Sequence, residues 1–204
     1  EGSTIFIPSF KFYGMKEIKG KLTLTETISS VGKYAFAGCD IYRIDIYDSN
    51  NEYRSDIVIN EGAFSNCIKL NTTVNLRYLK GDEIQDRIFS GCSNLPSIIF
   101  PSLIERIGNE AFSGCSSLSF QLDFITNLKY IGKSAFYRCL SLRGSLEISQ
   151  KTKYIGESAF YGCIGLSCSL TIHVLPSPKF SLAKPTFIGP FAFKYCSGFK
   201  NGKL

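Results

Sequence analysis

The 204-residue sequence has no tryptophan, one methionine and a single histidine, His173. One histidine excludes metal sites built on histidine pairs and removes the commonest member of acid–base groups. No segment approaches the ~18 consecutive apolar residues that a membrane-spanning helix needs. The 23 basic residues exceed the 17 acidic ones only slightly and form no basic block, so no nucleic-acid partner is indicated. Enzymes that depend on several catalytic histidines are excluded.

A repeat of about 24 residues runs through the chain. Its mark is a phenylalanine followed three residues later by a cysteine, and it occurs seven times. The phenylalanines are Phe36, Phe64, Phe89, Phe112, Phe136, Phe160 and Phe193, at intervals of 28, 25, 23, 24, 24 and 33 residues. Phe12, with Met15 in place of the cysteine, is interpreted as an eighth, degenerate copy.

Each repeat predicts two short strands and a turn. After the cysteine, an alternating apolar–polar run such as 142–148 predicts a half-buried strand. A second short run, such as 127–131, leads to a glycine. Gly108, Gly132, Gly156 and Gly189 are expected to reverse the chain with a positive φ, which glycine adopts easily. The Ala-Phe-x-x-Cys segment that follows is expected to form a helical turn with its apolar side chains on one face.

A unit of this size cannot bury its strand face and its Phe/Cys face alone, so neighbouring units must stack. The sequence therefore predicts an α/β repeat solenoid with a parallel β-sheet, short helical turns and about eight repeats. We expect one domain over 1–204, divided into a degenerate N-terminal repeat (1–27), regular repeats (28–172), a proline-containing insertion (173–187) and a truncated C-terminal repeat (188–204).

The pattern Ile-Gly-x-x-Ala-Phe-x-x-Cys-x-x-Leu followed by Leu-x-Ile resembles the BspA-like leucine-rich repeat over residues 12–199. Proteins of this family are typically surface or secreted proteins of bacteria and parasitic protists, associated with adhesion and virulence. The resemblance implies a non-catalytic solenoid that binds host matrix or other cells, on the cell surface or secreted. An intracellular scaffold or regulatory protein is the alternative. The N-terminal residues show no signal peptide, and we expect the chain to be a fragment of a longer protein.

The eight cysteines are expected to be mainly buried thiols, because free cysteine packs as a small hydrophobe. Cysteines stacked at the repeat interval would carry parallel Cβ vectors, which disfavours disulfides. Met15, at the equivalent position, would fill the same space. A pair of Cys163 with Cys168 is left open. No metal ion or cofactor is expected, since the cysteines are spread rather than clustered.

The outward side chains of the strands should form a polar face where protein partners dock. They are Lys21, Thr23, Arg43, Asp45, Thr73, Asn75, Gln121, Asp123, Ser145, Glu147, Ser169 and Thr171. Asp123 and Glu147 lie on adjacent strands, but a solvated face is favoured over acid–base chemistry because nothing would raise their pKa values. No catalytic residue is predicted, and no oligomeric state.

Two pairs of tyrosines are spaced 24 residues apart, Tyr130 with Tyr154 and Tyr137 with Tyr161, and each pair should stack between repeats. Tyrosine is common at binding hot spots, although for any single pair the favoured interpretation is that the rings cover the flank of the solenoid. The insertions at 48–54 and 173–185 are interpreted as surface loops of the kind that bind partners, and the second could instead be a cap over the end of the core. The candidate protein-binding residues are Arg43, Gln121, Asp123, Tyr130, Tyr137, Arg138, Glu147, Tyr154, Tyr161, Lys179 and Phe180.

Overall fold

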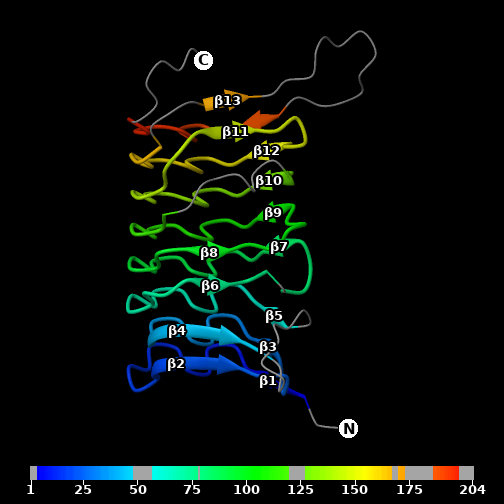
Figure 1. Cartoon of the computed structure of the whole chain (residues 1–204), viewed down its shortest axis with the longest axis vertical. Helices are drawn as coiled ribbons and strands as arrows, with labels where there is room; N and C mark the ends of the chain where they lie inside the picture. Colours follow the sequence, from blue (N-terminus) through cyan, green and yellow to red (C-terminus); the bar gives the residue numbers. More distant parts are fainter. Residues whose placement is uncertain are drawn as a thin grey trace.

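Short strands recur along the chain in two columns, one on each side of the coil (Figure 1). The structure, a computed structural model, describes residues 4–47, 57–77, 79–119, 127–166, 170–172 and 186–197. The first strand column contains β2 (Lys19–Leu24), β4 (Asp40–Ile46), β6 (Val74–Asn75), β8 (Ile98–Ile99), β11 (Leu146–Ile148) and β13 (Leu170–Ile172). The second contains β1 (Ile5–Ile7), β3 (Ile28–Val31), β5 (Val58–Ile59), β7 (Glu83–Ile84), β9 (Arg106–Ile107), β10 (Tyr130–Ile131), β12 (Tyr154–Ile155) and β14 (Phe187–Ile188).

The strand pairs within each column are parallel, which confirms the predicted solenoid with a parallel sheet. Alternation decides which side chains enter the core. In β11, Leu146 and Ile148 are fully buried and Glu147 between them is exposed. The strand β13 matches it in register, with Leu170 opposite Leu146. The fold is therefore a parallel β-solenoid of repeated coils with little helix.

Phenylalanine rings form the centre of the core. Rings of Phe12, Phe36, Phe64, Phe89, Phe112, Phe136, Phe160 and Phe193 stack in succession, with centroids 5.1 to 6.0 Å apart. The five rings from Phe64 to Phe160 are fully buried. Burial of one such side chain contributes about 1.5–3 kcal/mol, so this ladder supplies much of the stability. The predicted inward direction of the phenylalanines is confirmed.

The segment that carries alanine, phenylalanine and cysteine, named here the turn edge, is not helical, so the predicted helical turn was wrong. Its N–H groups alternate between two directions. That of Phe36 donates to Ala63 of the next coil (2.9 Å), and that of Cys39 donates to Phe36 within the turn (3.1 Å). Left-handed residues at two positions of each coil, such as Tyr34 and Gly38, cause this alternation. An α-helix would need consecutive right-handed residues and bonds four residues apart.

The glycine that precedes the turn edge is explained by close packing, not by φ, which corrects the expectation from sequence. None of the four glycines, Gly108, Gly132, Gly156 and Gly189, has a positive φ. A Cβ on Gly132 would lie 2.5 Å from the carbonyl carbon of Gly108. The left-handed position lies two residues later, for example at Ser134 (φ 52°). Glycine is therefore needed because successive coils approach too closely for a side chain.

Seven cysteines form a second ladder beside the phenylalanines. Each thiol donates a hydrogen bond to a phenylalanine carbonyl of the preceding coil, as Cys115 does to Phe89 at 3.1 Å. All seven are buried and free, which confirms the thiol prediction for them. Met15 is 42% exposed and does not fill the equivalent space, because it lies in the first coil. Cys168 lies outside the described residues.

Candidate functional site

The outer face of the first strand column is polar, as predicted. Its exposed side chains include Lys21, Thr23, Arg43, Thr73, Ser145, Glu147 and Thr171, and Asn75 is half-buried. Asp45 departs from the prediction, because it is only 7% exposed. The Nζ atom of Lys21 lies 2.8 Å from Asp45 Oδ2, and Arg43 Nε lies 2.9 Å from Asp45 Oδ1. Both long cationic side chains cover the carboxylate from neighbouring positions.

The two cations keep Asp45 ionised despite its burial. Burial by itself raises the pKa of a carboxyl group. The hydrogen bonds and charges of Lys21 and Arg43 outweigh that effect, so the pKa of Asp45 lies below its ordinary value. Asp45 therefore acts as an anchor that holds the two cations in place on the outer face.

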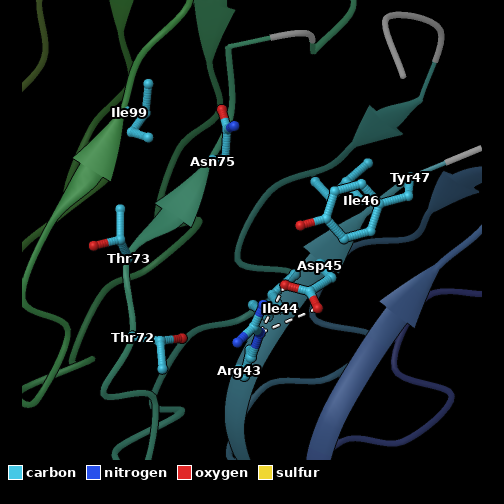
Figure 2. Close-up of a pocket in the computed structure, with 9 residues that line it drawn as sticks. All are labelled: Arg43, Ile44, Asp45, Ile46, Tyr47, Thr72, Thr73, Asn75 and Ile99. Carbon is cyan, nitrogen blue, oxygen red and sulfur yellow. Dashed lines mark hydrogen bonds and ion pairs between the residues drawn. The ribbon is translucent and has the colours of Figure 1, made fainter. Parts of the chain in front are cut away.

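A pocket opens on this face between β4 and β6 (Figure 2). Among the described residues, β4 pairs with β2 and β6 pairs with β8, whereas β4 and β6 do not form a ladder. The N–H of Asn71 and the hydroxyl of Thr72 both donate to Tyr42 (3.2 and 3.3 Å). Beyond that point the strands separate. The pocket has a volume of about 290 Å³ and is lined by Arg43, Ile44, Asp45, Ile46, Tyr47, Thr72, Thr73, Asn75 and Ile99.

A row of cation and aromatic side chains lies on the outer face of the second strand column. Arg106, Tyr130, Tyr154 and Phe187 occupy matching register positions on β9, β10, β12 and β14, and we name this row the aromatic stripe. The guanidinium of Arg106 lies 3.8 Å from the centroid of the Tyr130 ring. Tyr130 and Tyr154 stack at 4.6 Å, and Tyr154 and Phe187 stack at 5.2 Å. The predicted stacking of Tyr130 with Tyr154 is confirmed, and it extends in both directions.

The second tyrosine pair lies on the turn edge. Tyr137 and Tyr161 stack at 5.0 Å, which confirms their predicted contact, and Tyr195 meets Tyr161 edge-on at 5.1 Å. Arg138 beside them is exposed and left-handed, with φ of 56°. This pair is separate from the aromatic stripe, because it belongs to another edge of each coil.

A charged cluster on the turn edge was missed from the sequence. Arg87 lies 3.1 Å from Glu61 and 2.8 Å from Glu110, and Glu61 also pairs with Lys33 at 3.2 Å. The Tyr34 hydroxyl donates to Glu61 at 3.1 Å. Each of these contacts joins two neighbouring coils, so residues 23 to 28 positions apart meet. Only the repeat register, applied to charged residues, could have indicated these pairs.

A second depression, of about 470 Å³, is lined by Asp82, Leu103, Glu105, Asn127, Lys129 and Lys151. Its cations have partners. Lys129 lies 2.6 Å from Glu105, and Lys151 donates to Asn127 at 3.1 Å. Two acids and two bases therefore balance in this depression.

Several predicted residues lie outside the described residues: Gln121, Asp123, Lys179, Phe180 and the insertions at 48–54 and 173–185. Among the residues that the structure does describe, no three histidine, cysteine or acidic side chains gather as a possible metal site. In the same part of the chain, no helix has the length and apolar character needed to cross a membrane. The remaining candidates divide into the pocket face, the aromatic stripe and the turn-edge tyrosines.

The coils, their strand pairs and the buried Phe/Cys ladders define a leucine-rich repeat solenoid. The sequence matches the BspA type leucine rich repeat region over residues 2–72 and 54–167, in six copies, and the chain belongs to this family. Comparison with curated proteins found no match.

Two solved structures share the fold. A leucine-rich repeat protein from Bacteroides ovatus aligns with 23% identity and a TM-score of 0.51, over 95% of this chain. A leucine-rich repeat protein of T. pallidum aligns with 22% identity and a TM-score of 0.52, over 97% of this chain. The chain spans 56% of the length of the first protein and 72% of the second.

Proposed function

We propose that the chain is a non-catalytic, protein-binding solenoid that serves adhesion, within a cell-surface or secreted protein that contacts host matrix or other cells. The observation that carries this proposal is the aromatic stripe. Arginine and aromatic residues are the types most enriched at protein-binding hot spots. The stripe lies outside the buried Phe/Cys core, and Phe187 at its end is 53% exposed.

The stacking of the stripe favours binding because it removes freedom before a partner arrives. Tyr130 and Tyr154 are each held between two groups of neighbouring coils, and Phe187 stacks on Tyr154 at the end of the stripe, at distances of 3.8 to 5.2 Å. Binding normally costs about 0.5–1.5 kcal/mol for each flexible side chain that becomes ordered. Side chains that are already ordered avoid most of that cost. A flat row of such rings suits a protein surface.

The test is binding of the purified chain to immobilised extracellular-matrix proteins, measured by surface plasmon resonance. Saturable binding to at least one of them is expected. The double substitution Tyr130→Ala and Tyr154→Ala should weaken that binding more than tenfold, since hot-spot residues each contribute about 2 kcal/mol or more. The matched control is Tyr137→Ala with Tyr161→Ala, which removes a similar stacked pair from the turn edge. Equal losses in both variants, or no saturable binding, would contradict the proposal.

The second candidate is an intracellular leucine-rich repeat scaffold or regulatory protein. The seven buried free thiols favour it, because reduced cysteines are typical of reducing compartments. Antibody labelling of intact and permeabilised cells distinguishes the two. Labelling of intact cells supports the surface protein, and labelling only after permeabilisation supports the scaffold.

We also propose that the terminal coils around Phe12 and Phe193 are repeats of the same kind, which brings the count to about eight, within the division of the chain given above. Phe12 stacks on Phe36 at 5.1 Å, and Phe193 stacks on Phe160 at 5.6 Å. Deletion of residues 1–27 should then leave a folded, shorter solenoid, because each coil contacts only its neighbours. Complete unfolding of that variant, measured by circular dichroism, would contradict the assignment.

A further inference from the structure

The pocket between β4 and β6 is richer in hydrogen-bond donors than in available acceptors. Its buried carboxylate, Asp45, already accepts from Lys21 and Arg43. The side-chain oxygen of Asn75 accepts from the N–H of Arg77 at 3.0 Å. The carboxylate of Asp45 and the side-chain oxygen of Asn75 are therefore already engaged by the protein itself.

Donors remain on the open side of the pocket. Arg43 bonds Asp45 through Nε and also has a side-chain hydrogen bond with Tyr47, and its guanidinium, which has five N–H groups, lies on the side of Thr72 (Figure 2). The Asn75 side chain still has its amide N–H groups, and the Thr73 hydroxyl is exposed. A ligand that fits must therefore bring acceptor oxygens.

The charge around the pocket also favours a ligand with acceptor oxygens. The described lining holds one cation, Arg43, and one acid, Asp45. Lys21, which lies outside the lining, also pairs with Asp45, so the three residues together carry one positive charge. The second depression has as many acids as bases. A positive excess beside a half-enclosed surface attracts an anion more strongly than the same charge in open water.

The walls define the size of that anion. The Tyr47 ring and Ile99 lie on opposite sides, and the Tyr47 hydroxyl points across the pocket toward β6 (Figure 2). A volume of about 290 Å³ accommodates a side chain and does not accommodate a folded loop. A carboxylate on a short apolar stem satisfies the donors and the walls together.

We propose that this pocket binds the carboxylate of a glutamate or aspartate side chain on a partner protein. This inference rests on the proposed protein-binding function, for which it names the chemistry of one contact. Arg43 and the Asn75 amide donate to the carboxylate oxygens, and Thr73 closes the site at the surface. Asp45 is a positioning residue that holds Arg43 in place and does not touch the ligand.

The experiment uses the full chain and two probes, N-acetyl-glutamate methylamide and the matched glutamine compound. Binding is followed by the NMR signals of the Arg43 Nε–H and the Asn75 side-chain amide. The glutamate probe is expected to shift both signals with saturation. The glutamine probe should bind at least tenfold more weakly. Equal binding of the two probes, or no saturable shift with the glutamate probe, overturns the proposal.

Variants locate the site. Arg43→Gln should weaken the glutamate probe at least tenfold, whereas Lys151→Gln, which removes the same charge from the second depression, should change it less than twofold. Equal losses in these two variants would mean a general effect of net charge and would overturn the proposed site.

Arg43→Gln also removes a partner of Asp45, so a second variant that changes no charged residue is needed, and Thr73→Val is that variant. It should weaken the probe about threefold without a change in the midpoint of thermal unfolding, and unchanged binding contradicts the geometry.

The two proposals fail separately. If the glutamate probe binds but matrix proteins do not, the carboxylate site is supported and the adhesive function is contradicted. If matrix proteins bind through the aromatic stripe while Arg43→Gln leaves binding of the glutamate probe unchanged, the adhesive function is supported and the carboxylate site is contradicted.

Discussion

The turn edge and the strand columns of this solenoid follow the same coils with different regularity. On the turn edge, hydrogen bonds join neighbouring coils from Phe12 to the coil of Phe193 in one repeated pattern. The strand columns, in the described part of the chain, divide into sheets of three, five, two, two and two strands. Backbone pairing is continuous where the sequence repeat is strictest and interrupted where it varies.

The difference has a physical origin. Positions on the turn edge carry alanine, phenylalanine and cysteine, which must fit between identical neighbours in a closely packed core. Strand positions face solvent on one side and tolerate changes in length and residue type. The gap between β4 and β6 lies at the 28-residue interval, the longest between Phe36 and Phe160. Regular residues therefore supply stability, and the irregular interval supplies a pocket.

The largest expected effect concerns the thiol ladder at alkaline pH. Burial raises the pKa of Cys67 to about 12 and raises those of Cys92, Cys115, Cys139 and Cys163 as well. The folded state therefore holds these protons more tightly than the unfolded state. The contribution of the buried thiols to the free energy of unfolding is fully present below the ordinary thiol pKa of ~8.5 and is lost as the pH rises above that value.

Each buried thiol should lose about 1.4 kcal/mol of stability for every pH unit above ~8.5. Five thiols together should lose about 7 kcal/mol for every pH unit, which is comparable with a typical total stability of about 5–15 kcal/mol within one to two pH units. Urea unfolding followed between pH 8 and 11 checks this. Cys139→Ala should reduce the slope of unfolding free energy against pH by the contribution of one thiol. Stability that stays level up to pH 11 would show that the thiols do not titrate with folding.

The next largest effect is the loss of stability when one of two adjacent aromatic residues is replaced, Phe136 in the core or Tyr137 on the surface of the turn edge. Phe136→Ala should cost about 3–5 kcal/mol, because it opens a cavity in the fully buried ladder. Tyr137→Ala should cost about 0.5–1.5 kcal/mol, because this half-buried ring loses mainly its stacking on Tyr161. Chemical denaturation of both variants measures the difference. Equal costs would mean that the core does not depend on the phenylalanines.

The sequence was sufficient to predict the parts of the structure that depend on repetition. Spacing alone indicated the stacked coils, the inward phenylalanines and cysteines, and the Tyr130–Tyr154 contact. It did not predict the left-handed turn edge, because Glu110 and Ser134 carry no preference for positive φ. A signal was present at the other left-handed position. Glycine recurs immediately before the cysteine, as Gly38, Gly91 and Gly114 do, and that recurrence favours positive φ.

The candidate sites were harder to predict because they depend on coils meeting in space. The burial of Asp45 requires Lys21 from one strand and Arg43 from its neighbour, and neither contact follows from a polar alternation. The aromatic stripe was half predicted. Arg106 and Phe187 share no residue type with the tyrosines, so a search for recurring tyrosine did not find them. The pocket required the separation of β4 from β6, which no residue pattern specifies.

The smallest expected effect separates the two reasons for glycine on the turn edge. Gly132→Ala should cost about 1–3 kcal/mol, because the new Cβ would lie 2.5 Å from the backbone of Gly108 and force the coils apart. Ser134→Gly should instead stabilise the fold by about 0.5–1 kcal/mol. It relieves the left-handed cost of a side chain, about 1–2 kcal/mol, at the expense of some chain entropy. Both are measured by thermal unfolding. A gain at Gly132 would contradict the requirement for glycine by close approach of the coils, and a loss at Ser134 would contradict the left-handed cost assigned to that position.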